Sequence, residues 1–146
     1  MRALVLASLL ASPFAHAAAH CDIALKAGDS MMYDQRSVSV DAACKTITIH
    51  LTHTGTMAVG DMGHNVVIAR TQDVDAIADD GMTAGVASDF LKPGDPRVIA
   101  HTKTIGGGEK ADASFPADKL KPGDGYSFFC TVPGHAVLMV GQLLVK

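Results

Sequence analysis

Alternation of apolar and polar residues over residues 45–52 is the feature that most restricts how this chain can fold. Ile47, Ile49 and Leu51 fall on one side of an extended backbone, and the residues between them are threonine or histidine. A two-residue period is that of a β-strand with one buried face, whereas an amphipathic helix repeats about every 3.6 residues. The segment therefore predicts a half-buried strand in a layered β-protein.

Clusters of Gly, Pro and Asp separate further short β-prone runs, which occupy residues 37–40, 66–69, 97–102, 125–130 and 139–145. Seven or eight short strands of this kind are typical of a sandwich or a barrel. Residues 73–82 break the pattern, because Val74, Ile77 and Ala78 recur at helical spacing after an acidic start. We therefore expect an all-β sandwich or barrel with one short inserted helix.

The first residues have the order of a secretory leader. Arg2 supplies a positive charge, an apolar run interrupted by one serine follows, and residues 15–19 contain two overlapping small-x-small cleavage patterns. A membrane anchor is the alternative, but the apolar run is shorter than the roughly 20 residues that span a bilayer. We expect residues 1–19 to be a signal peptide cleaved near 17–19. Residues 20–146 would then form a single periplasmic domain without membrane insertion.

The composition excludes several classes of protein. With 48% hydrophobic and 18% charged residues, the chain is too apolar to be disordered. A formal net charge of −3 lacks the basic excess of nucleic-acid-binding domains, so no nucleic-acid partner is expected. The HExxH and GxSxG motifs of hydrolases are missing, and no acidic pair stands in a catalytic frame. An enzymatic activity is therefore not expected.

Three cysteines in an exported protein leave one without a partner, because thiols usually pair in an oxidising compartment. Cys21 and Cys44 are close in the sequence, whereas Cys130 lies far downstream. The simplest pairing is a disulfide between Cys21 and Cys44, which would stabilise the fold by roughly 3 kcal/mol in the chain-entropy model. Cys130 is then a free thiol that is either buried and inert or bound to a metal.

A set of metal-binding side chains lies near the C-terminus. Cys130, His135 and Met139 follow one another on a loop between two predicted strands, and His64 lies upstream. Two imidazoles, a thiolate and a weak thioether are the ligand set of a blue-copper centre. Zinc has no use for a thioether, and a Cys–His nucleophile would need an oxyanion site that the sequence does not reveal. We therefore predict one copper ion that cycles between Cu(I) and Cu(II).

Three functions are compatible with such a site. Electron transfer is favoured, because a site with few ligands and one long bond serves both oxidation states of copper with little rearrangement. Copper carriage or storage would need exchangeable copper, which a rigid three-ligand site disfavours. A thiol hydrolase would need an orienting group beyond the Cys–His pair.

Five motifs give the sequence a close resemblance to the azurins, a bacterial family of blue-copper cupredoxins. They are Met-Gly-His-Asn at 62–65, Asp-Gly-Met at 80–82, Arg-Val-Ile-Ala-His-Thr-Lys at 97–103, Gly-Glu-Lys at 108–110 and Phe-Phe-Cys-Thr at 128–131. The match keeps one register from Cys21 to Lys146. It includes the inserted helical segment, which separates the azurins from shorter plastocyanin-type proteins.

The resemblance implies an eight-stranded Greek-key β-sandwich and a periplasmic protein that shuttles one electron between redox partners. It also implies a role for Asn65, which would join the two ligand loops and hydrogen-bond near the Cys130 sulfur. The implied copper ligands are His64, Cys130 and His135 in the equatorial plane, with Met139 and the backbone carbonyl of Gly63 as weak axial ligands.

The same resemblance implies an apolar docking surface and a pH-responsive group. Transient docking would bring c-type cytochromes or periplasmic reductases and oxidases to this surface, because small interfaces release quickly. His53 would be the buried histidine that responds to pH. The docking surface would consist of Met31, Met57, Met62, Met82, Val137 and Leu138.

Three positions depart from the azurin pattern. Val66 stands where azurins usually have a buried tryptophan, so the centre of the core must be packed differently. Val132 replaces a common aromatic residue beside the copper, which alters the packing there. Asp61 stands where azurins often have an apolar residue, which changes the surface that a partner meets.

Overall fold

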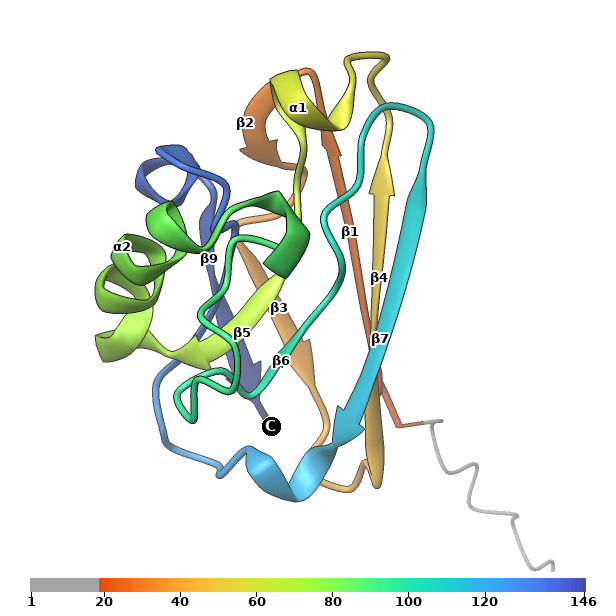
Figure 1. Ribbon diagram of the computed structural model, residues 1–146. Coiled ribbons are helices and arrows are strands. Elements are labelled where there is room, and N and C mark those ends of the chain that lie inside the picture. The colour runs from red at the N-terminus through yellow and green to blue at the C-terminus, as the bar shows by residue number, and fades with distance from the viewer. Residues whose placement is uncertain (1–18) are drawn as a thin grey trace, which may run out of the picture.

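Two β-sheets packed face to face form the body of the molecule, as Figure 1 shows for the computed structural model, which describes residues 19–146. The four-stranded sheet has the order β2-β1-β4-β7 and the five-stranded sheet the order β3-β9-β8-β5-β6. The all-β sandwich is therefore confirmed, and the two separate sheets exclude a closed barrel for the described residues. The predicted signal peptide and its cleavage site lie outside the described residues, apart from Ala19.

The strands of the first sheet are β1 (Asp22–Gly28), β2 (Ser30–Tyr33), β4 (Thr46–His53) and β7 (Lys110–Pro116). Those of the second are β3 (Ser37–Val40), β5 (Val67–Arg70), β6 (Ala100–His101), β8 (Tyr126–Phe129) and β9 (Val140–Val145). The sandwich has nine strands within residues 19–146 rather than eight. Two of these elements are irregular: β6 is only two residues long, and the pairing of β1 with β2 has a register shift between Ala27 and Gly28.

The alternating segment forms β4, in the interior of the four-stranded sheet. β4 pairs in parallel with β1 and antiparallel with β7. Its apolar residues Ile47, Ile49 and Leu51 are at most 1% exposed and belong to the main core between the sheets. The prediction that one face of this strand is buried is therefore confirmed.

A helix covers the outer face of the five-stranded sheet. α2 (Val74–Ala84) places Val74 and Ile77 against Val67 and Phe129 in a second, smaller core. This arrangement explains why β8 is buried on both faces, whereas β4 has a polar outer face. The helix predicted over residues 73–82 is confirmed, and it continues for two further residues before Gly85, whose φ of +75° ends the helix.

Shorter helical turns connect the strands. They are α1 (Val59–Met62), η1 (Thr71–Asp73), η2 (Val86–Ser88), η3 (Ala117–Lys119) and η4 (His135–Val137). Within residues 19–146, no helix is long and apolar enough to cross a membrane.

The strand predicted over residues 97–102 is largely wrong, because only β6 forms there. The Arg97 backbone N–H donates to the Asp95 side chain over 3.0 Å, which holds the beginning of the segment in a turn. Strands β1, β2 and β7 lie outside the β-prone runs. β1 contains Asp, Ala, Lys and Gly, which have low strand propensity, and its pairing with β4 overrides that preference.

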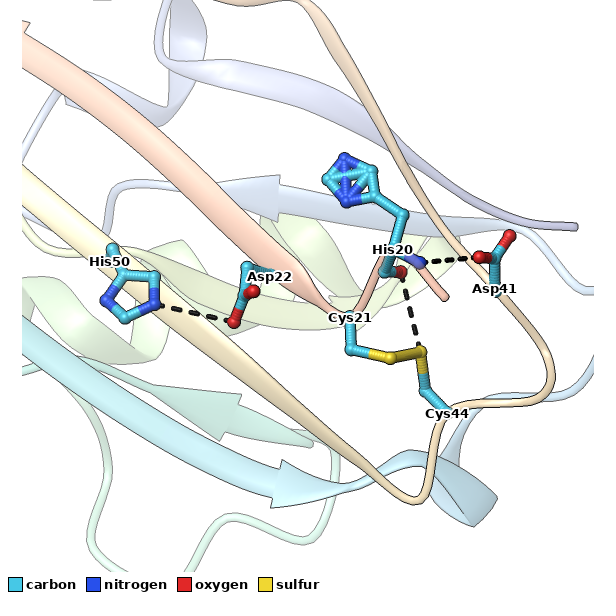
Figure 2. Close-up of a disulfide and its surroundings, with 6 residues drawn as sticks. All are labelled: His20, Cys21, Asp22, Asp41, Cys44 and His50. Atoms are coloured by element: carbon cyan, nitrogen blue, oxygen red, sulfur yellow. Dashed lines mark hydrogen bonds and ion pairs between the residues drawn. A yellow bond between two sulfur atoms is a disulfide. The ribbon is translucent and has the colours of Figure 1, made fainter. Parts of the chain in front are cut away.

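The disulfide between Cys21 and Cys44 joins the beginning of β1 to the turn before β4, as Figure 2 shows. The Cα atoms of the two cysteines are 5.7 Å apart. Within the described chain Cys130 is free and buried. The pairing expected from the cysteine spacing is therefore confirmed.

We expect thiol titration of the unfolded, metal-free protein to find one reactive thiol, that of Cys130. The disulfide persists on unfolding without a reductant, so Cys21 and Cys44 should react only after reduction, when three thiols appear. Three thiols before reduction, or a disulfide peptide that contains Cys130, would contradict the pairing.

On the outer face of the four-stranded sheet, a histidine on the strand β4 contacts side chains of both neighbouring strands. His50 of β4 lies 2.7 Å from Asp112 of β7 through Nδ1 and 3.5 Å from Asp22 of β1 through Nε2. Figure 2 shows the contact between His50 and Asp22. The hydrogen bond to Asp112, followed by the charges of both carboxylates, raises the pKa of His50 above its ordinary value. The charged form of His50 is therefore favoured in the folded state.

His50→Gln should make stability less dependent on pH. A raised folded-state pKa stabilises the protein fully below the unfolded pKa near 6.5, and this stabilisation is lost as the pH rises through the folded-state pKa. Because the cluster is exposed, the variant should lose at most about 1 kcal/mol at pH 5 and nothing at pH 9. Urea unfolding of both metal-free proteins across this range measures the difference. A loss that does not change with pH would contradict the charge effect, and Asp112→Asn should reproduce the pattern.

Candidate metal centre

His64 stands after α1 and is fixed on both sides. Its backbone exchanges two hydrogen bonds of 2.9 Å with Ile105. Its ring Nε2 lies 2.8 Å from the carbonyl oxygen of Gly28. A carbonyl only accepts, so Nε2 carries the proton and Nδ1 has a free lone pair. Within the described chain this Nδ1 is buried and has no hydrogen-bond partner.

A tight loop between β8 and β9 supplies Cys130, His135 and Met139. Gly134 has a φ of +82°, a left-handed conformation that glycine adopts readily, and it reverses the chain just before His135. The Met139 N–H donates to the His135 carbonyl over 2.8 Å, and the Cys130 N–H donates to the Met139 carbonyl over 3.0 Å. The two ends of the loop are therefore closed on each other by backbone hydrogen bonds.

The two segments bring three donor side chains to one point. The ligand atoms of His64, Cys130 and His135 all lie within 4.8 Å of one another. The sulfur of Cys130 is 3.6 Å from Nδ1 of His135. Cys130, His64 and Met139 are fully buried, and His135 is 6% exposed, so the site lies just beneath the surface.

Burial controls the protonation of these groups. Loss of hydration lowers the pKa of His64, and it lowers the pKa of His135 to about 4, with a smaller contribution from the charge of His64. Burial also raises the pKa of the Cys130 thiol to about 11. At neutral pH both imidazoles are thus neutral electron-pair donors, whereas a cation must displace the proton from the thiol.

These donors fit a copper ion. The orphaned Nδ1 of His64 would otherwise be a buried polar atom without compensation, which is energetically costly. A thiolate and two imidazoles, with the thioether residue Met139 buried beside them, match the soft and borderline ligand preferences of copper.

The comparisons with known proteins agree with this donor set. Residues 19–146 match the family model described as copper binding proteins, plastocyanin/azurin family. The chain belongs to this family of copper-binding proteins. It is 44% identical over 146 residues to an azurin of Pseudomonas aeruginosa, with 100% of this chain and 97% of that protein covered. It is 48% identical over 126 residues to an azurin of Achromobacter denitrificans, with 86% of this chain and 85% of the other covered.

A solved structure shows the same fold. The azurin Az-iso2 of the methylotroph Methylomonas sp. strain J aligns with a TM-score of 0.84 at 42% identity. The alignment covers 86% of this chain and 98% of that one. The cupredoxin fold is therefore shown for the described residues, and copper is the cofactor of the family to which the chain belongs. His64, Cys130 and His135 form a potential site for it.

The side chain of Asn65 connects the two ligand loops of this cupredoxin. Its Nδ2 donates to the Thr131 hydroxyl and to the Asp89 carbonyl, both over 2.8 Å. Its Oδ1 accepts from the Thr131 N–H over 2.9 Å. Asn65 therefore holds the residue after His64 and the residue after Cys130 at a fixed separation, and it is fully buried.

The six residues of the expected docking surface differ in exposure. Val137 is 81% exposed, Met82 60% and Leu138 47%. Met31 and Met57 are 37% and 39% exposed, and Met62 is half-buried. Outside this set, further exposed apolar side chains are Met32, Val59 and Val86.

The three departures from the azurin pattern lie in different environments. Val66 is completely buried in the same core cluster as Tyr33 and Phe128. Val132 is half-buried beside the ligand loop, and Asp61 is exposed on α1.

Gly63 and His53 are both close to His64. A Cβ on Gly63 would approach the Val59 carbonyl oxygen to 2.4 Å, so only glycine fits between α1 and His64. His53 is 1% exposed, and its ring stacks on that of His64 with the centroids 4.9 Å apart. His101, by contrast, is exposed.

Tyr33 is a site residue that the sequence pattern did not reveal. It is 7% exposed, and its ring edge packs on Phe128 with the centroids 5.5 Å apart. Its hydroxyl donates a hydrogen bond to the backbone carbonyl of Asn65. Burial raises the pKa of Tyr33 well above the ordinary value, so the hydroxyl keeps its proton and remains a donor. An isolated tyrosine on β2 carries no motif by which this contact could be found.

Tyr33→Phe should destabilise the metal-free protein by about 1–2 kcal/mol, because the buried Asn65 carbonyl loses its donor. Urea unfolding measures the loss, and amide hydrogen exchange at Asn65 and Thr131 should accelerate. Tyr126→Phe is the matched control, since its hydroxyl bonds Lys121 and Asp124 at the other end of β8. It should leave exchange at Asn65 and Thr131 unchanged. Unchanged stability of Tyr33→Phe would contradict a stabilising hydrogen bond.

Proposed function

We propose that the protein carries single electrons between partner proteins in the periplasm, with one copper ion held by His64, Cys130 and His135. The observation that carries the proposal is the convergence of two imidazole nitrogens and a buried thiol, whose ligand atoms lie within 4.8 Å of one another. Bound copper would supply the one-electron chemistry by alternating between Cu(I) and Cu(II).

The chain itself provides a site that needs little rearrangement. His64 is oriented by the Gly28 carbonyl, and the backbone N–H groups of Asn65 and Val132 donate toward the Cys130 sulfur. Such contacts around a ligand fix its position and tune the metal. Met139 and the Gly63 carbonyl are proposed as the weak axial ligands, and both residues are buried.

Exposed apolar side chains above His135 suit a transient encounter. The proposed docking surface is the set Met31, Met57, Met62, Met82, Val137 and Leu138. Its most exposed member, Val137, follows His135 by two residues in η4. A small interface of this kind would release its partner quickly, as repeated electron exchange requires. The proposed partners are c-type cytochromes or periplasmic reductases and oxidases.

Periplasmic location is supported by the disulfide between Cys21 and Cys44, because disulfides persist in oxidising compartments. The secretory pattern of residues 1–19 supports the same location.

A thiol hydrolase is disfavoured by the protonation state of Cys130. A nucleophilic cysteine has a lowered pKa and partial exposure, whereas burial raises the pKa of this thiol to about 11. A copper carrier is disfavoured by the depth of the ligands, because Cys130 and His64 are fully buried.

We also propose that His53 responds to pH. Its Nδ1 accepts from the Gly55 N–H over 3.1 Å, and its Nε2 donates to the Met62 carbonyl over 2.9 Å. A second ring proton on Nδ1 would break the first of these bonds. The residue after His53 is Thr54, so any rearrangement occurs in a Thr-Gly segment.

Visible and electron paramagnetic resonance spectroscopy of the copper-loaded protein tests the function. We expect an intense blue band for the native chain and its loss in Cys130→Ser, because the band requires a copper–thiolate bond. Met139→Leu should stay blue and have a higher reduction potential, since a weak donor favours Cu(II) over Cu(I). A colourless native protein would exclude the blue-copper function. Loss of the blue band in Met139→Leu would indicate that Met139 is a primary ligand. An unchanged reduction potential would indicate that Met139 is an ordinary core residue.

A further inference from the structure

A groove beside the ligand loop combines apolar side chains with two carboxylates. It has a volume of about 350 Å³ and runs between α2 and the loop that carries His135. Met82, Val132 and Val137 contribute apolar surface, and Asp75 and Asp79 contribute the charge. In Figure 1 the green α2 and the blue turn before β9 lie next to each other at this side of the sandwich.

The two carboxylates have no counter-charge in the described chain. Within residues 19–146 neither Asp75 nor Asp79 forms an ion pair, and α2 contains no lysine or arginine. Arg97, which forms an ion pair with Asp80 of α2, bonds Asp95 as well and so is already paired with two carboxylates.

The two carboxylates repel each other and so destabilise α2. Asp75 and Asp79 are four residues apart, and like charges at that spacing repel each other on one helix face. Asp75 lies in the first turn, where the helix dipole favours an acidic residue, but Asp79 is beyond the reach of that effect. A cationic partner surface would remove the repulsion.

A positive charge also lies beside the apolar surface. The guanidinium of Arg36 donates to the Leu138 carbonyl over 2.9 Å, which holds it next to the exposed Val137 and Leu138. The exposed apolar residues near His135 therefore have Asp75 and Asp79 of α2 beside Val137, and Arg36 beside Leu138. Such an asymmetry fixes the orientation of a partner as well as its charge.

We propose that the groove at Asp75 and Asp79 receives lysine or arginine side chains of a redox protein that docks over His135. This inference rests on the proposed function and specifies the partner class: a protein with an apolar patch around its redox group and basic residues on one side of it. In each encounter with a reduced c-type cytochrome, one electron would leave the ferrous haem and reduce the copper-loaded protein. No bond is made or broken and no proton is transferred.

Electron transfer from a reduced, lysine-rich c-type cytochrome to the oxidised, copper-loaded protein tests the inference by stopped-flow absorbance. Asp75→Asn/Asp79→Asn should lower the second-order rate constant at least about threefold at low ionic strength, because steering by opposite charges is lost. The difference should disappear at high salt, where charges are screened. Electron transfer from an acidic c-type cytochrome should be faster with the double variant than with the native protein.

The control variant is Asp118→Asn, compared with Asp79→Asn, because both remove one exposed aspartate charge. Asp118 lies in η3, which Figure 1 places at the other end of the sandwich from α1. Asp79→Asn should slow the reaction and Asp118→Asn should not. Equal slowing by both variants would show an effect of net charge and would overturn the proposed role of the groove. The proposal would also be overturned if the double variant did not slow the reaction, or if the slowing persisted at high salt.

Failure of the proposed function would look different. The copper-loaded native protein should be blue and should exchange electrons reversibly with ferricyanide and ferrocyanide. If it does so while the double variant reacts like the native protein, the groove alone is wrong. If it does neither, the electron-transfer function is wrong.

Discussion

Hydrogen bonds of the buried Asn65 side chain hold together the two segments on which the metal site depends. His64 and Cys130 belong to loops that are far apart in the sequence, and neither loop alone can place its donor against the other. Asn65 bonds Thr131 in both directions and also reaches the Asp89 carbonyl. Tyr33 adds a fourth contact through the Asn65 backbone. The distance between the two ligand loops is therefore set by direct polar contacts in the buried interior, where such bonds are strong.

The same interior makes the site costly when it is empty of a cation. Burial removes hydration from two imidazoles and a thiol, lowers the pKa values of His64 and His135, and raises that of Cys130. His64 Nδ1 has no hydrogen-bond partner within the described chain. A cation compensates these losses together, so metal binding stabilises the folded protein and releases a proton from the thiol. The sandwich tolerates this local cost because its main core and the disulfide stabilise the chain elsewhere.

The surface above the site is divided by charge. The exposed Val137 and Leu138 give it an apolar centre, Arg36 lies beside Leu138, and Asp75 and Asp79 line the groove at α2. The helix thus has two functions in the architecture. Its inner face closes the second core against β5 and β8, and its outer face presents carboxylates next to the ligand loop.

The sequence by itself determined the elements whose signals are local. The period-two pattern identified β4, the helical spacing identified α2, and the order of Cys130, His135 and Met139 identified the ligand loop, because one turn of backbone brings these residues together. Cysteine number and spacing were enough for the disulfide. Tertiary structure alone decided the rest. The strand character of β1 comes from its pairing with β4. The contacts of His64 with Gly28, and of Tyr33 with Asn65, join residues more than thirty positions apart. Such contacts depend on how the two sheets and their loops pack, and no local pattern of residues records that packing.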